Sequence, residues 1–152
     1  MDKRVYKISY LTKEFYRNFT EDKFPEILHK ENRPYLVFIV KVENNTFAIP
    51  FRTNVTHQYS YRFKNTDKAT DTSTGLDFSK AVIVNENLYI GNDASIDKKE
   101  FIELENKVYF IIKKFSNYVK NYIRYTKDKN TEMLDKKYKF SSLQYFNKEL
   151  GI

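Results

Sequence analysis

The chain has 152 residues, 41% of them hydrophobic and 17% aromatic, as expected for one folded domain with a substantial core. It has no Cys and only two His, which excludes disulfide scaffolds, thiolate metal sites, Cys nucleophiles and multi-histidine metal centres. Its 27 Lys and Arg against 20 Asp and Glu give a formal charge of +7. Clustered basic side chains would indicate a nucleic-acid partner, whereas an even spread would only keep the protein soluble.

Neither a membrane span nor a signal peptide is indicated by the sequence. No apolar run approaches the roughly 20 residues that a spanning helix needs. The N-terminal sequence MDKRVYKISY is charged and has no apolar stretch that a signal peptide would require. We therefore expect a soluble cytoplasmic protein with no membrane partner, folded as a single domain over residues 1–152.

Alternating and β-branched residues predict the elements of the first third of the chain. Residues 4–10 predict a strand, and residues 11–19 predict a short helix that Thr12 caps. Residues 34–42 predict a strand whose apolar run is nearly continuous over 35–40, which indicates a central strand covered on both faces. After a short turn, residues 46–51 return as its hairpin partner.

A change of character follows at residues 52–78, which are polar and rich in hydroxyl groups. A stretch of this length without strong periodicity is typical of a functional loop. Residues 78–84 predict another strand, which we expect to pair with residues 88–90. Apolar residues then recur at 3- and 4-residue spacing over residues 98–124, which predicts one long helix facing the core.

The C-terminal region completes an α+β fold. Residues 126–132 are interpreted as a linker, and Ser141 or Ser142 is expected to cap a short last helix. The predicted architecture is a small, strongly curved and mostly antiparallel sheet with helices packed on it.

Chemistry-bearing side chains concentrate where the predicted hairpin ends. Arg52 could bind phosphate oxygens, Thr53 and Asn54 could donate hydrogen bonds, and His57 could act as acid or base because an unperturbed His titrates near neutrality. These parts would suffice to cleave RNA without a metal, by proton transfer from the 2′-hydroxyl and to the leaving 5′-oxygen. Spacing alone favours a plainer interpretation, in which they are ordinary loop and turn residues.

Four further residues are weaker candidates. His29 could face the same groove as His57 or simply end a short helix, and Tyr10 fits a half-buried sheet residue. Ser79 and Lys80 open a predicted strand, from whose rim a Lys can reach a phosphate. The sequence has neither a Gly-rich phosphate loop nor spacing typical of a metal site, so no cofactor or metal is expected.

Several segments, taken in order, resemble the ToxN/AbiQ family of type III toxin–antitoxin endoribonucleases and its CptN and TenpN relatives. The matching segments are 6–10, 32–35, 48–54, 75–84 and 140–146. The resemblance implies a compact barrel-like sheet and metal-independent cleavage of cellular or phage RNA to 2′,3′-cyclic phosphate and 5′-hydroxyl ends. It also implies inhibition by a small repeat-derived pseudoknot RNA antitoxin, bound directly in a closed protein–RNA assembly.

The resemblance carries over residue by residue. Thr53 matches the hydroxyl residue of the family's Thr/Ser segment, and Arg33 matches a basic residue that precedes the central strand. Tyr10 matches an N-terminal Tyr of the family. His29 falls near a position where relatives have a Tyr. ToxN-like members have a Lys where this chain has Val55, so Arg52 or His57 would have to supply the cationic role.

We therefore predict a sequence-selective endoribonuclease toxin. The predicted catalytic residues are Thr53, His57 and Arg52, and the predicted RNA-binding residues are Tyr10, His29, Arg33, Asn54, Ser79 and Lys80. The alternative is a non-catalytic single-stranded RNA or DNA-binding module that uses the same basic, aromatic surface. A third interpretation is an interaction protein that does not bind nucleic acid.

Overall fold

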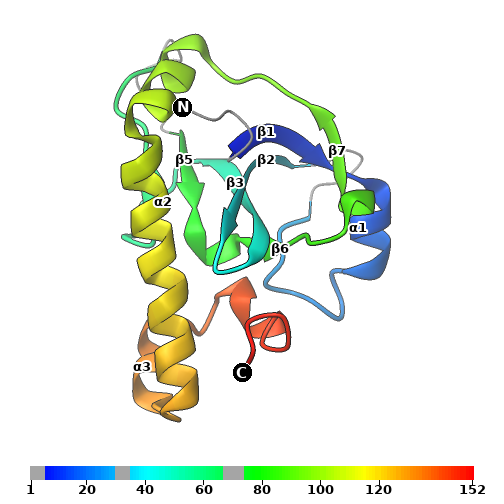
Figure 1. Ribbon diagram of the computed structural model, residues 1–152, viewed down its shortest axis with the longest axis vertical. Helices are drawn as coiled ribbons and strands as arrows, with labels where there is room; N and C mark the ends of the chain where they lie inside the picture. The colour runs from blue at the N-terminus through cyan, green and yellow to red at the C-terminus, as the bar shows by residue number, and fades with distance from the viewer. Residues whose placement is uncertain (1–5, 30–34, 67–73) are drawn as a thin grey trace.

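A computed structural model describes residues 6–29, 35–66 and 74–152, and Figure 1 shows a sheet with a long helix along one side. The strands are β1 (Tyr6–Leu11), β2 (Leu36–Val42), β3 (Asn45–Thr53), β4 (Ser60–Arg62), β5 (Thr74–Asp77), β6 (Val82–Ile83) and β7 (Ile90–Asp93). The helices are α1 (Lys13–Asn18), α2 (Lys98–Lys127) and α3 (Thr131–Lys137), with 3₁₀ turns η2 (Phe78–Lys80), η3 (Asn87–Tyr89) and η4 (Ser142–Tyr145). The predicted α+β class is confirmed.

The sheet is antiparallel and open. Its strand order is β4-β5-β3-β2-β1-β7, with β6 pairing β3, and every pair of neighbours is antiparallel. Within the described ranges β4 and β7 do not pair, so the barrel-like closure that the resemblance implied is not observed. Both edge strands are short, and β7 joins β1 through a register shift between Ser9 and Leu11. Short, irregular edges of this kind end strand pairing.

The β2–β3 hairpin forms the centre of the sheet, as predicted. Glu43 and Asn44 both have positive φ (52° and 66°), the backbone that matches a tight turn to the twist of two strands. Phe47 and Ile49 on one face are fully buried, and so are Val37 and Ala48 on the other, which confirms that both faces of these strands are covered. No described helix is both long enough and apolar enough to cross a bilayer.

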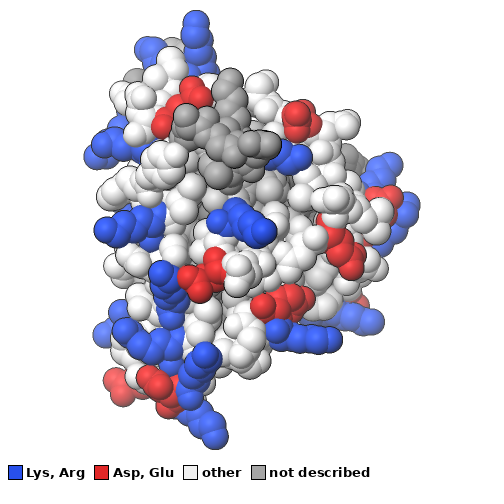
Figure 2. All heavy atoms as spheres, viewed as in Figure 1, with Lys and Arg blue, Asp and Glu red and all other residues white. Residues whose placement is uncertain are grey.

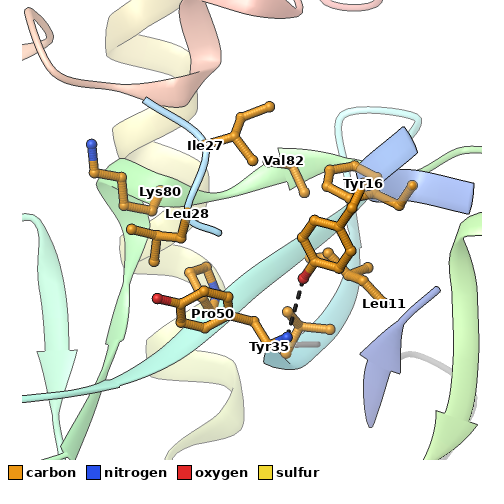
Figure 3. Close-up of a pocket in the computed structure, with 11 residues that line it drawn as sticks. Leu11, Tyr16, Ile27, Leu28, Tyr35, Pro50, Lys80 and Val82 are labelled. Carbon is orange, nitrogen blue, oxygen red and sulfur yellow. Dashed lines mark hydrogen bonds between the residues drawn. The ribbon is translucent and has the colours of Figure 1, made fainter. Parts of the chain in front are cut away.

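The two faces of β3 meet different partners. Phe47 packs its ring on Phe115 of α2, with 5.0 Å between centroids, so α2 covers this face. Pro50 lies on the opposite face, beside Tyr16 and Leu28 (Figure 3). The cavity drawn there measures about 10 Å³, room for about one water, and it is therefore a packing defect and not a ligand site.

Helix α2 confirms the long helix that the apolar periodicity predicts. It begins at Lys98 as predicted and runs to Lys127, three residues beyond the expected end. Asp97 caps it by accepting a hydrogen bond from the backbone N–H of Glu100 at 3.1 Å. The predicted cap at Ser141 is also confirmed, because its hydroxyl accepts from the N–H of Leu143 at the start of η4.

Three expectations for the middle and end of the chain are corrected. The stretch interpreted as a polar loop contains β4 and β5, and helix α3 follows α2 where no helix was predicted. The expected hairpin between 78–84 and 88–90 is wrong, because β6 pairs β3 and β7 pairs β1. The β1–β7 contact needs Gly91, since a Cβ there would lie 2.8 Å from the carbonyl oxygen of Tyr10.

Candidate nucleic-acid interface beside a buried aspartate

Asp77, at the end of β5, is the centre of a cluster of polar side chains and is fully buried. Strand register places Arg52 opposite Gly75, so Asp77 lies two residues further along on the same face as Arg52. Arg52 donates from Nη1 to Asp77 Oδ2 at 2.7 Å. His57 approaches the other oxygen, with 3.1 Å between Nε2 and Oδ1.

Ser79 completes this cluster. Its hydroxyl donates to Asp77 Oδ1 at 2.6 Å and its backbone N–H donates to the same oxygen at 3.0 Å. A buried carboxylate is tolerated only with such partners, so these contacts fix its orientation. We call Arg52, His57, Asp77 and Ser79 the Asp77 cluster.

The imidazole of His57 is engaged at both nitrogens. Its Nδ1 accepts the backbone N–H of Tyr59 at 3.1 Å, which places the ring proton on Nε2, facing Asp77. The next turn is held as well, because the Ser60 hydroxyl donates to the His57 carbonyl at 2.7 Å. To accept a proton from a substrate, His57 must therefore give up the hydrogen bond to Tyr59.

Thr53 lies apart from the Asp77 cluster. Successive strand residues point to opposite faces, so Thr53 shares a face with Phe51 and not with Arg52. Asn54 follows with a φ of 58°, in the left-handed region, where β3 ends. Both side chains are exposed. The structure thus brings Arg52 and His57 together but leaves the Thr53 hydroxyl on the other side of the sheet.

A pocket of about 230 Å³ opens between the Asp77 cluster and α3, and we call it the α3 pocket. This volume is far above the roughly 10–15 Å³ that one water needs, so it can admit a ligand. Its lining residues are His57, Tyr59, Ser79, Asp135, Lys136, Lys137, Lys139, Phe140 and Ser141. Three lysines and three rings thus surround a space that the Asp77 cluster borders.

The net positive charge of the chain arises from the region that contains this pocket. Residues 107–139 hold ten Lys and Arg against three Asp and Glu, an excess of seven. The whole chain has 27 against 20, so the other residues balance at 17 against 17. Figure 2 shows Lys and Arg gathered along α2 and around α3 at the lower left. The basic side chains are therefore clustered, the condition that favours a polyanionic partner.

Two basic side chains, Lys114 and Arg62, lie close together where α2 meets β4. Lys114 donates to the Ser60 carbonyl at 2.8 Å. Burial lowers the pKa of Lys114, and the charge of Arg62 lowers it further. A bound phosphate would relieve this repulsion.

The remaining predicted residues lie in other surroundings. Tyr10 is 39% exposed and shares a face with Ile8, the face that α2 covers. His29 is held with Nε2 2.6 Å from the Phe19 carbonyl, and Lys80 pairs with Glu26 at 2.8 Å. Arg33 lies outside the described residues.

Sequence reasoning missed the α3 lysines and Phe140. Part of the local charge excess over residues 107–139 lies on the predicted long helix, but Lys136 and Lys137 belong to a helix that was not predicted. Among the described residues no three His, Cys, Asp or Glu side chains gather as metal ligands do.

No family model, curated protein or solved structure matches the chain. The resemblance to the ToxN/AbiQ family therefore stays a prediction.

Proposed function

We propose that this protein binds single-stranded RNA across the basic surface of residues 107–139 and cleaves it at the α3 pocket without a metal. The observation that supports this proposal is the coincidence of two features, since the region that holds the charge excess supplies three lysines to a pocket that is also lined by His57, the partner of the buried Asp77. Phosphates attract the lysines, and unstacked bases find flat rings in the same place.

His57 is the proposed general base. RNA entering the pocket would displace the Tyr59 N–H from Nδ1, and that nitrogen would take the 2′-hydroxyl proton. Asp77 would keep the other ring proton at Nε2 and stabilise the imidazolium that forms.

Attack of the 2′-oxygen on phosphorus then changes two bonds. The 2′-oxygen bonds to phosphorus as the bond from phosphorus to the 5′-oxygen breaks, which leaves a 2′,3′-cyclic phosphate. An ammonium group of the pocket supplies the proton that the 5′-oxygen takes up. Arg52 and the lysines offset the charge of the pentacoordinate phosphate.

The toxin role is part of the proposal and rests on the family resemblance. A small folded RNA that presents a cut end could occupy the same pocket and block it, in a closed protein–RNA assembly in the cytoplasm. This arrangement needs no second binding site on the protein.

A second candidate function is a single-stranded RNA or DNA-binding module without catalysis. Two observations favour it: both ring nitrogens of His57 are hydrogen-bonded, and Thr53 lies on the opposite face from Arg52. The basic surface would serve this function equally well.

The test is cleavage of a long unstructured RNA by RNA-free protein in excess EDTA, with the product ends analysed. We expect cyclic phosphate and 5′-hydroxyl ends, a loss of roughly 10²–10⁴-fold in rate for His57→Ala, and retained RNA binding by that variant. Bound but intact RNA would support the binding module instead.

A single Thr53→Ala variant locates the reaction. Because Thr53 lies across the sheet from Arg52, loss of cleavage in this variant with activity retained in His57→Ala would place the reacting groups on the other face. That outcome would contradict the proposed site while leaving an endoribonuclease.

A further inference from the structure

We propose that Phe140 is a stacking platform for one unpaired nucleobase of single-stranded RNA, with the adjacent phosphate held by Lys139. This inference rests on the proposed function and assigns a base-binding position within the α3 pocket. It concerns a residue that lies outside the Asp77 cluster.

Phe140 combines an exposed ring with an anchored backbone. Its side chain is 63% exposed, whereas the following Ser141 and Ser142 are buried. The Phe140 carbonyl accepts from Lys80 Nζ at 2.8 Å, and the Ser142 hydroxyl donates to the carbonyl of Ala81. The ring is therefore presented to solvent by a fixed segment, which lowers the entropy lost when a ligand stacks on it.

Exposure alone would mean little, because single exposed apolar side chains are common. The surroundings set Phe140 apart. Lys139 Nζ lies 5.6 Å from the centroid of the Phe140 ring, so a flat apolar face and a cation stand together. One nucleotide presents the complementary pair, a flat base and an anionic phosphate.

The rest of the pocket supports the same ligand. Lys136 and Lys137 add positive charge to the lining, and Tyr59 and His57 contribute two rings whose centroids are 6.0 Å apart. Acidic side chains are few, since Asp135 is the one carboxylate among the lining residues. Rings within a cationic rim are typical of proteins that bind single strands by stacking and phosphate contacts.

Phe101 provides a control on the same molecule. It is an exposed aromatic residue of α2, 39% exposed, but it lies outside residues 107–139 and does not line the α3 pocket. Removing either ring takes an exposed aromatic from the surface, so any difference between the two variants reports position.

The first experiment measures binding of a 2′-O-methyl oligouridine, which cannot be cleaved by 2′-hydroxyl attack, by fluorescence anisotropy. We expect Phe140→Ala to weaken binding roughly tenfold, Phe140→Tyr to restore it, and Phe101→Ala to leave it unchanged. With the same oligomer carrying abasic units, Phe140→Ala should have no effect, because the base that stacks is gone.

A second experiment observes stacking directly. The chain has no Trp, so Phe140→Trp introduces the sole indole. Its fluorescence should be quenched by the oligouridine and not by the abasic oligomer. A thermal melt matching the parent would show that each variant is folded.

The outcomes separate this inference from the proposed function. Salt-dependent binding of the parent with equal affinity for Phe140→Ala, and no base-dependent quenching, overturns the stacking platform and leaves RNA binding standing. Absence of any salt-dependent binding by the parent overturns both.

Discussion

The Asp77 carboxylate holds the candidate site together because the side chains of Arg52, His57 and Ser79 all contact it. Each contact is short, between 2.6 and 3.1 Å, and the acceptor is fully buried. Arg52 and His57 are themselves only about a third exposed. The cluster therefore holds the His57 imidazole in the wall of the α3 pocket with little freedom to move, and the Arg52 guanidinium is bound to the same carboxylate.

Replacing Asp77 by Asn should destabilise the fold by about 2–3 kcal/mol. The amide offers one oxygen in place of two, and its NH₂ group would face donors, so at least one buried contact is lost. Urea denaturation measures the change. Asp93→Asn is the matched control, since Asp93 is 86% exposed and lies 3.9 Å from Lys7, and we expect it to be nearly neutral. Equal stability of the two variants would contradict a structural role for the cluster.

Parts of this site were predictable from residue types, and its centre was not. Arg52 and His57 were selected because guanidinium and imidazole groups suit phosphate chemistry, whereas Ser79 was named only together with Lys80. Their common partner is 25 positions from Arg52, and it is brought there by the pairing of β3 with β5. Since β5 was not predicted, Asp77 had no assigned neighbour. Thr53 was grouped with Arg52 because the predicted strand ended at residue 51, whereas β3 runs to Thr53 and strand alternation separates the two side chains.

At the scale of elements, α3 is held against α2 by tyrosines. The Tyr138 hydroxyl donates to the carbonyl of Tyr118 at 2.7 Å, and the Tyr118 hydroxyl donates to Ser141 at 2.9 Å. The ring centroids of Tyr118 and Tyr138 lie 4.8 Å apart. Burial raises the pKa of both phenols well above the ordinary value near 10. These contacts fix the wall of the α3 pocket that carries its lysines.

Stability should therefore fall as the pH rises above about 10. Below that pH the phenols are protonated in both folded and unfolded chains; above it the unfolded chain loses protons that the folded chain keeps, which favours unfolding. Each such Tyr lowers the free energy of unfolding by about 1.4 kcal/mol per pH unit above that pH. Denaturant unfolding at stepped pH measures the slope. Tyr118→Phe should make it shallower, although the variant starts less stable because it loses the bond to Ser141; an unchanged slope would contradict the assignment.

Elements with a long regular pattern were predicted well, and short ones were not. Helix α2 repeats its apolar spacing over many turns, and the β2–β3 hairpin has a continuous apolar run with a turn sequence. Strand β5 reads Thr-Gly-Leu-Asp, and all four residues are buried by partners distant in sequence. Helix α3 has seven residues and no buried one, so its sequence lacks an apolar stripe.

Considered as a whole, the molecule is electrostatically divided. The region 107–139 holds an excess of seven positive charges, and the remaining residues balance. Such a division produces a field that attracts a polyanion to one side and orients it before contact. Lysines of this region line the α3 pocket, so a polyanion attracted to this surface would arrive beside His57 and Ser79.

Salt dependence tests this division quantitatively. For single strands the logarithm of affinity falls with the logarithm of salt concentration by about 0.7 for each phosphate neutralised. Replacing Lys136, Lys137 and Lys139 by Ala should therefore reduce the slope by about 2 and weaken binding at low salt, measured by anisotropy with the 2′-O-methyl oligouridine. The control is the triple variant of Lys13, Lys23 and Lys41, which are exposed but lie outside the basic region. It removes the same net charge, so an equal loss of slope in both variants would show that RNA responds to total charge and would contradict a binding surface at α3.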